Sequence, residues 1–238
     1  MYKKIGILGF GEVGKAISRF YKKPLIRDLD RNEFVRPLDI LHVCIPFNKN
    51  FIKIVSQNII NYKPEIVVIH STVSIGTTLK LYKKFGNIVH SPIRGIHPGL
   101  YEGIKTFVKY VGMDSHIIGN KVLKHFKDIG IKGYLIEQSK TTEALKLWDT
   151  TQYGIMIMLE KEIYRYCQEN DLNFQVIYSR ANETYNRGYK KLGKPNVARP
   201  ILKQMDGKIL GHCVMSNAKI LSNGSWLAKL LVNKNKEY

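Results

Sequence analysis

Three glycines near the start of the chain constrain its fold more than any other feature of the sequence. Gly9, Gly11 and Gly14 have the spacing G-x-G-x-x-G, and the apolar run Ile5–Leu8 before them is typical of a strand. Apolar residues at helical spacing begin at Val13, so the glycines lie at a strand-to-helix turn. In such a turn the first glycine permits the tight bend, the second lets a ligand approach the backbone, and the third lets the helix pack close to the strand.

An acidic residue at the end of the next apolar run completes this pattern. Asp28 closes a predicted second strand, roughly 20 residues after the first glycine, where a carboxylate binds the adenosine ribose of a dinucleotide. We therefore predict NAD as the cofactor, with its pyrophosphate at the helix N-terminus and with Asp28 repelling the 2′-phosphate of NADP. Arg27 and Arg31 flank the acid and would soften this preference, and the alternative is a glycine turn that binds no dinucleotide. The predicted cofactor-binding residues are Gly9, Phe10, Gly11, Glu12, Val13, Gly14, Asp28, Pro46, Ser71 and Thr72.

The length and charge of the chain limit the class of protein to which it can belong. Its 238 residues suffice for one dinucleotide-binding domain and a smaller second domain. The formal net charge is +19, but the lysines and arginines are scattered as singles and pairs, which indicates a solvated surface. Such a surface favours anionic ligands. We expect no specific nucleic-acid site, because no nucleic-acid-binding motif accompanies the charge.

The cysteine and hydropathy patterns narrow the class further. Cys44, Cys167 and Cys213 are too widely separated for a zinc motif or a disulfide framework, so we expect no metal and a reducing, cytoplasmic location. The sequence has no run of about 18 apolar residues, which predicts no membrane span. The first strand begins almost at the first residue, so we also expect no signal peptide.

Strands that alternate with helices predict a doubly wound parallel sheet of the Rossmann type. We assign this α/β domain to residues 1–138 and a smaller all-helical domain to residues 139–238. The predicted strands are Lys4–Leu8, Leu25–Asp28, Ile40–Ile45, Ile66–His70, Ile88–His90, Lys109–Gly112 and Gly133–Ile136. The predicted helices are Glu12–Tyr21, Phe51–Asn61, Gly119–Gly130, Lys140–Gln168 and Phe174–Arg187, followed by one that ends near Leu221 and one over residues 224–233.

The helix predicted over Lys140–Gln168 has a broad apolar face. This face consists of Ala144, Leu147, Trp148, Ile155, Met158, Leu159, Ile163 and Tyr166. It is larger than so small a helical domain can cover, so we expect the chain to form a homodimer.

Four further segments occur in an order that is specific to one family. They are Ser71–Thr78, Ser91–Arg94, Glu143–Leu147 and Gly211–Cys213. In this order the chain resembles the UDP-glucose/GDP-mannose dehydrogenase family over nearly its whole length. Members of that family oxidise an alcohol of a sugar nucleotide to a carboxylate in two NAD-dependent steps. They continue into a third domain, which holds the nucleotide of the substrate, and we expect this chain to be a shortened form without that domain.

The resemblance implies roles for three residues. Cys213 matches the family's nucleophile, whose thiolate adds to an aldehyde before the adduct loses a second hydride. Lys146 matches a lysine that stabilises oxyanion charge, and Thr72 matches a threonine near the nicotinamide and the reacting water. We expect these side chains to converge at the carboxyl edge of the sheet. The alternatives are a buried structural cysteine, a surface lysine and a helix N-cap.

Three positions depart from the family pattern. Thr150 stands where the family has an asparagine, Asn217 where it has an aspartate, and Ile93 where it commonly has a glutamate. Thr150 and Asn217 remain candidate catalytic residues, but an amide cannot act as a general base. We therefore expect a slow second step that stops at an aldehyde or at a long-lived adduct on Cys213.

The segment Ser91–Gly99 carries a second set of candidates. Arg94 and His97 follow the end of a strand, where sites form in α/β folds, and can bind a carboxylate or a phosphate. His97 could also act as the general acid or base, a role that the amide of Asn217 cannot fill. We group His212 with them as substrate-binding residues. The alternative is a loop stiffened by proline and glycine, with exposed charges.

Three functions therefore remain open. The first is an NAD-dependent dehydrogenase of the nucleotide-sugar type that acts on an anionic substrate. The second resembles the 6-phosphogluconate and 3-hydroxyacid dehydrogenases, which perform one hydride transfer with a lysine on the long helix and need no cysteine. The third is a non-catalytic module that binds NAD.

Overall fold

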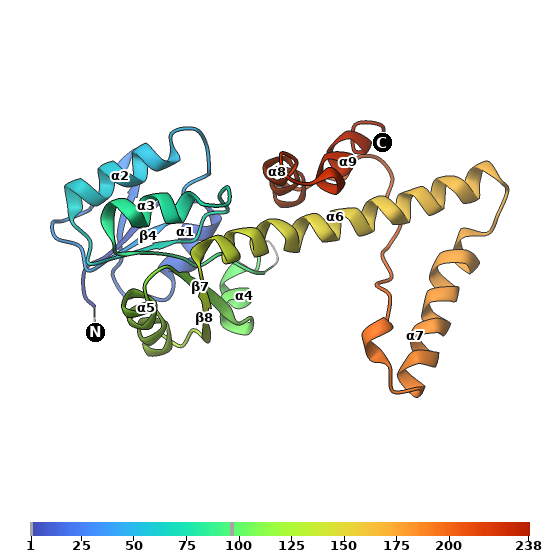
Figure 1. Cartoon of the computed structure of the whole chain (residues 1–238), viewed down its shortest axis with the longest axis horizontal. Coiled ribbons are helices and arrows are strands. Elements are labelled where there is room, and N and C mark those ends of the chain that lie inside the picture. The colour runs from blue at the N-terminus through green and yellow to red at the C-terminus, as the bar shows by residue number, and fades with distance from the viewer. Residues whose placement is uncertain (1, 96–97) are drawn as a thin grey trace. The chain divides into compact units, whose positions relative to one another are not determined.

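The computed structural model describes residues 2–95 and 98–238, which form two compact units. The first unit ends at Lys146 and the second begins at Leu147. The predicted boundary lay after residue 138, but the first two turns of the long helix are anchored to the sheet unit by side chains described below. Figure 1 labels some of the elements of each unit, and each unit is described here by itself.

An eight-stranded sheet forms the centre of the first unit as the structure describes it. Its strands are β1 Ile5–Leu8, β2 Leu25–Asp28, β3 Arg31–Asn32, β4 Ile40–Val43, β5 Ile66–Ile69, β6 Ile88–His90, β7 Lys109–Met113 and β8 Gly133–Glu137. They are arranged in the order β3-β2-β1-β4-β5-β6-β7-β8. Neighbours are parallel except for the pairs β2–β3 and β6–β7, which are antiparallel.

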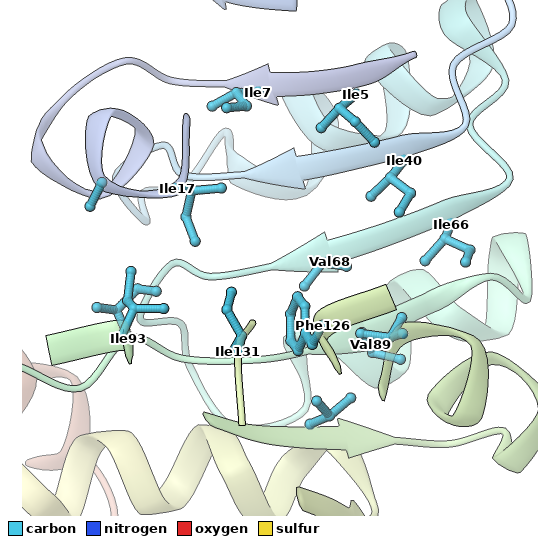
Figure 2. Packing of buried hydrophobic residues seen from close by; sticks show 14 of the residues in the cluster. Ile5, Ile7, Ile17, Ile40, Ile66, Val68, Val89, Ile93, Phe126 and Ile131 are labelled. Carbon is cyan, nitrogen blue, oxygen red and sulfur yellow. The ribbon is translucent and has the colours of Figure 1, made fainter. Parts of the chain in front are cut away.

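Helices cover both faces of this sheet (Figure 1). They are α1 Glu12–Ser18, α2 Phe51–Tyr62, α3 Thr77–Phe85, α4 Leu100–Thr106 and α5 His116–Asp128. One apolar cluster joins α1, α4 and α5 to one face, and a second joins α2 and α3 to the other. Figure 2 shows part of the first cluster, in which Ile40, Val68 and Phe126 are buried. The predicted doubly wound sheet is therefore confirmed.

Three elements of this unit are absent from the sequence-based prediction. Strand β3 is short and polar, and helices α3 and α4 span only a few turns each. Elements of this size carry too few periodic residues to be recognised. The antiparallel direction of β7 was also not predicted, because direction depends on the path of the preceding connection and not on the side-chain pattern.

The second unit is helical, as predicted. The long helix α6 spans Ser139–Glu169 and carries the chain from the first unit into the second. It is followed by the π-helix η1 Gln175–Arg180, α7 Ala181–Lys191, the 3-10 turn η2 Pro195–Val197, α8 His212–Leu221 and α9 Trp226–Lys234. Gly154 lets these helices approach closely, because a Cβ there would lie 2.5 Å from the Val214 side chain and 2.8 Å from that of Leu231. No helix in the described ranges is both long enough and apolar enough to cross a membrane.

A buried chain of hydrogen bonds crosses the face of the sheet that α1 and α5 cover. The Tyr21 hydroxyl lies 2.8 Å from both His42 Nε2 and His125 Nε2, and His42 Nδ1 lies 2.9 Å from His70 Nε2. His70 Nδ1 is 2.8 Å from the carbonyl oxygen of Ser91. A carbonyl only accepts, so His70 donates to it. With neutral rings, His42 then donates to His70, Tyr21 to His42, and His125 to Tyr21.

A buried lysine ends this chain. Lys109 Nζ donates to the carbonyl oxygens of Ser91 at 2.7 Å and of Pro92 at 3.1 Å. Burial lowers the pKa of Lys109 to about 7. The lysine and His70 together fix the backbone at the point where the chain leaves β6.

Burial also keeps the histidines of this face neutral. It lowers the pKa of His42 and His70 well below the ordinary range, that of His125 to about 4, and that of the neighbouring His90 to about 3. In the unfolded chain each histidine titrates near its ordinary pKa of about 6.5. The unfolded state therefore binds more protons than the folded state below this pH, and acid favours unfolding.

We predict that the free energy of unfolding falls as the pH drops from 7.5 to 5.5, by roughly 1 kcal/mol per buried histidine between pH 6.5 and 5.5. Urea titrations at these pH values measure it. The variant His42→Gln should reduce the slope, whereas His116→Gln should not, because His116 is exposed. A free energy of unfolding that stays constant over this range would show that the buried histidines are not neutral in the folded state.

Candidate cofactor and active site

The carboxyl ends of four parallel strands lie side by side at one edge of the sheet. The strand register places their last residues in one row, which consists of Leu8, Val43, Ile69 and His90. Ligands of such sheets bind outside the carboxyl ends, where successive connections leave toward opposite sides. Here that point lies between β1 and β4, at the glycine turn.

Two of the three glycines are required by the protein's own packing. Gly9 has a φ of +92°, and a Cβ there would lie 2.9 Å from the backbone of Cys44. A Cβ on Gly14 would lie 1.9 Å from the carbonyl oxygen of Gly9, so only glycine lets α1 approach β1 this closely.

No packing contact of this kind in the described part of the chain requires a glycine at Gly11. Its φ is −69°, which any residue adopts, and a Cβ there would meet no described protein atom within 4 Å. It directly precedes Glu12, the first residue of α1, and its own side of the turn is open. A glycine beside open space at this place fits a ligand that approaches the backbone closely, as the pyrophosphate of a dinucleotide does.

Asp28 is fixed beside the same turn. One of its carboxylate oxygens accepts a hydrogen bond from the Phe10 amide at 2.9 Å, and the other accepts one from the Leu29 amide at 2.9 Å. Phe10 lies between the first two glycines, so the carboxylate is held next to the open side of the turn. Each oxygen retains capacity for a further hydrogen bond, as two ribose hydroxyls require. The residues present therefore fit a dinucleotide.

The loops after β4 and β5 complete this edge. The Ser71 hydroxyl donates to the carbonyl oxygen of Ile45 at 2.7 Å, which ties the segment carrying Thr72 to the one carrying Pro46. Pro46 is exposed and Thr72 is half-buried. Both predicted cofactor positions thus lie at the carboxyl edge of the sheet.

A buried carboxylate attaches helix α6 to the Thr72 loop. Glu143 accepts hydrogen bonds from the amides of Gly76 at 2.5 Å and Thr78 at 2.7 Å. Burial raises the pKa of Glu143, and the bonds from Thr78 and Gly76 oppose that rise. The carboxylate thereby joins the loop that begins at Ser71 to the helix that carries Lys146.

His90 makes a second connection between the same two segments. Its Nδ1 lies 2.8 Å from the Thr142 hydroxyl on α6, and its Nε2 lies 3.2 Å from the carbonyl oxygen of Ser71. The charge of Lys146, one helical turn after Thr142, helps to lower the pKa of His90, after burial and together with Lys109. Lys146 therefore lies near the Thr72 loop within the first unit.

The second unit brings together two of the positions that depart from the family pattern. The Asn217 side-chain amide donates to the Thr150 hydroxyl at 2.8 Å, and Asn217 is buried. Cys213 is half-buried and lies one turn before Asn217 on α8. His212 begins this helix, but its side chain lies outside what the structure describes. Because Cys213 belongs to the second unit, its convergence with Thr72 and Lys146 stays a prediction.

The segment after β6 presents an arginine and turns an isoleucine inward. The guanidinium of Arg94 lies over two aromatic rings, 5.7 Å from the centre of Phe107 and 5.5 Å from that of Tyr110. Ile93 is buried in the apolar cluster of Figure 2, so the position of the family's glutamate faces the core in this chain. His97, the other candidate of this segment, lies outside the described residues.

Sequence reasoning missed the buried polar chain and the part played by Glu143. The only signal for the former was a set of histidines at core positions of apolar strands, which include His42 and His90. Across the described ranges, no group of three or more His, Cys, Asp or Glu residues is arranged to hold a metal ion.

Comparisons with known proteins show what this fold is similar to. No protein-family model and no curated protein sequence matches the chain. Among solved structures, it is similar to the UDP-D-ManNAc dehydrogenase of Pyrococcus horikoshii, with a TM-score of 0.77 and 15% identity over 99% of this chain and 68% of that one. A UDP-glucose dehydrogenase from Pyrobaculum islandicum gives a TM-score of 0.74 and 13% identity, over 100% and 68% of the two chains.

A solved structure from another class is also similar. The 3-hydroxyisobutyrate dehydrogenase of Mycobacterium tuberculosis gives a TM-score of 0.69 and 12% identity, over 100% of this chain and 94% of that one. At these identities the likeness shows a shared fold. That fold is the Rossmann-type sheet followed by a helical unit, as found in dehydrogenases of both classes.

We predict that Gly11→Ala impairs cofactor binding, whereas Gly14→Ala impairs stability. Gly11→Ala should leave the free energy of unfolding within about 1 kcal/mol of the wild type, as for a change at a helix N-cap, but weaken NADH binding at least tenfold, because the new methyl group would occupy the space predicted for the phosphates. Gly14→Ala should destabilise the fold by several kcal/mol, because its Cβ collides with the Gly9 carbonyl. Urea titration and NADH fluorescence measure the two effects. A Gly11→Ala variant that binds NADH normally would contradict the assignment.

Proposed function

We propose that the chain is an NAD-dependent oxidoreductase that oxidises an alcohol carbon on a small anionic substrate, of the nucleotide-sugar dehydrogenase type. The observation that carries this proposal is the open space at Gly11 beside the fixed carboxylate of Asp28. No contact among the described residues requires a glycine there, whereas the close approach of a pyrophosphate would. The similarity in fold to dehydrogenases supports the same conclusion.

The chain's own residues supply binding and charge stabilisation. NAD, when bound, would accept a hydride from the alcohol carbon. The glycine turn would hold its pyrophosphate and Asp28 its adenosine ribose. Lys146, anchored near the Thr72 loop through Glu143 and His90, would stabilise negative charge on the substrate oxygen as the alcohol proton leaves.

Arg94 would recognise the anionic group of the substrate. A guanidinium is a planar fork that matches a carboxylate or a phosphate. The rings of Phe107 and Tyr110 restrict its orientation, and the Ser91 hydroxyl, which donates to the Tyr110 carbonyl at 2.8 Å, ties the loop to β7. This restriction reduces the side-chain entropy that binding would otherwise cost.

The proposal also includes covalent catalysis by Cys213. Its thiolate would add to the carbon of an aldehyde product, and transfer of a hydride from the adduct to a second NAD would leave a thioester for water to hydrolyse. The two positions at which the family has carboxylates do not assist this hydrolysis. Asn217 is an amide that donates to Thr150, and Ile93 is buried in the core. We therefore expect the second step to be slow.

The number of hydrides transferred tests this mechanism. With anionic alcohols and nucleotide sugars as substrates, we predict one fast and one slow equivalent of NADH per substrate, with a mass increase on Cys213 in the intact protein. Cys213→Ala should keep the first equivalent and lose both the second and the adduct. Cys167→Ala is the matched control, because Cys167 is buried in a separate cluster with Phe174 and Tyr178. If Cys213→Ala still yields two equivalents, the cysteine is not the nucleophile.

The second candidate is a one-hydride dehydrogenase of the 3-hydroxyacid or 6-phosphogluconate type. The observation that favours it is that Lys146 and the Thr72 loop belong to one unit, in which Glu143 and His90 join the loop to the helix that carries the lysine. Lys146 and His97 would then be the catalytic pair. A single equivalent of NADH in both the wild type and Cys213→Ala would select this candidate, and binding of NADH without turnover would indicate a non-catalytic module.

We further propose a homodimer that is formed through the second unit. Three residues of the predicted apolar face of α6 are exposed, namely Trp148, Leu159 and Tyr166. Leu210 and Trp226 of the same unit are also exposed. Apolar side chains at this density usually contact a partner.

Light scattering at micromolar concentration should therefore give the mass of a dimer. The double variant Leu159→Lys with Tyr166→Lys should be monomeric, because it places charge in the contact. Ile117→Lys on α5 is the control and should stay dimeric, because Ile117 is an exposed apolar residue of the first unit. A monomeric wild type would contradict the proposal.

A further inference from the structure

The hairpin that follows Asp28 places a cation beside the proposed cofactor site. Strands β2 and β3 are antiparallel, and their register sets Arg31 opposite Asp28. The Arg31 guanidinium lies over the Phe10 ring, 5.6 Å from its centre, and the amide of that same residue binds Asp28. Arg31 is thus next to the carboxylate that would hold the adenosine ribose, which is where NADP carries its additional phosphate.

Glu33 engages this cation. One of its carboxylate oxygens lies 2.7 Å from the Arg31 guanidinium. The other accepts a hydrogen bond from the Ile26 amide at 2.9 Å, while the Glu33 amide donates to the Ile26 carbonyl at 2.9 Å. Glu33 is therefore held to β2 through both its carboxylate and its backbone amide, and the hydrogen bond from Arg31 holds the pKa of Glu33 below its usual range.

Arg27, the other arginine beside Asp28, also contacts a neighbouring side chain. The Arg27 guanidinium donates to the Tyr62 hydroxyl at 2.5 Å and lies over the Tyr62 ring. The sequence alone suggested that both arginines would weaken the preference for NAD over NADP. In the structure, each guanidinium is held by a neighbouring side chain.

We propose that Glu33 is a second determinant of dinucleotide preference, because its pairing with Arg31 withholds that guanidinium from a 2′-phosphate. The proposal rests on the proposed NAD site. Asp28 disfavours NADP by direct repulsion, and Glu33 does so by occupying a group that would otherwise bind a phosphate in bidentate fashion. Removal of the Glu33 charge leaves Arg31 beside the ribose position without its ion-pair partner.

Binding of NADH and NADPH to the purified protein, followed by cofactor fluorescence, tests this proposal without any substrate. In Glu33→Gln we expect NADPH to bind about tenfold more tightly, which corresponds to about 1.4 kcal/mol, while NADH affinity changes less than twofold. The gain should shrink in 0.5 M salt, because exposed charges are screened. It should vanish when Arg31→Gln is combined with Glu33→Gln.

Glu65→Gln is the matched control. Glu65 pairs with Lys121 at 2.8 Å, and the side-chain exposures of that pair, 49% and 45%, are close to the 41% and 48% of Glu33 and Arg31. It directly precedes β5 at the opposite, amino edge of the sheet. This variant makes the same change in net charge, and both affinities should stay within twofold of the wild type.

Failure of this proposal can be distinguished from failure of the cofactor assignment. If the wild type binds NADH but Glu33→Gln gains less than twofold for NADPH, the role of Glu33 is overturned and the cofactor site stands. An equal gain in Glu65→Gln or in the Arg31→Gln background also overturns it, because the effect would then be one of net charge alone. If the wild type binds neither dinucleotide, both proposals are overturned.

Discussion

The carboxylate of Glu143 is the interaction on which the proposed active site depends. It satisfies two backbone amides of the loop after β5 from a position on α6 that is wholly buried. An unpaired buried amide costs about 1–3 kcal/mol, so the loop and the helix are stable only together. As a result, Thr72 and Lys146 are kept in one compact unit, and the division between the units falls within the long helix, after Lys146.

The glycine turn shows how folding and function can be separated within one motif. Gly9 and Gly14 are required by contacts inside the protein, which would exist in any closely packed strand–turn–helix unit. Gly11 is required by none of these contacts. Asp28 combines both roles, because its carboxylate accepts hydrogen bonds from two backbone amides and still retains capacity for a further bond on each oxygen. The proposed cofactor site therefore rests on Gly11 and not on the motif as a whole.

The polar chain from Tyr21 to Lys109 carries a desolvation cost that apolar side chains of the same shape would avoid, and its hydrogen bonds offset that cost. What it provides is a fixed hydrogen-bond direction that ends on the carbonyl oxygens of Ser91 and Pro92. The segment that carries Arg94 begins at these carbonyls. We interpret this chain of hydrogen bonds as a rigid support for the proposed substrate side of the site.

The sequence by itself determined the Rossmann-type sheet, the helical second unit, the glycine turn and Asp28, because these depend on local periodicity and on short fixed spacings. It could not give the direction of β7, the inward orientation of Ile93 or the pairing of Arg31 with Glu33. The first depends on the path of a connection, and the other two depend on which side chains meet across neighbouring strands and loops. Residues distant in sequence meet only when the sheet is assembled, so these features were decided by the tertiary structure.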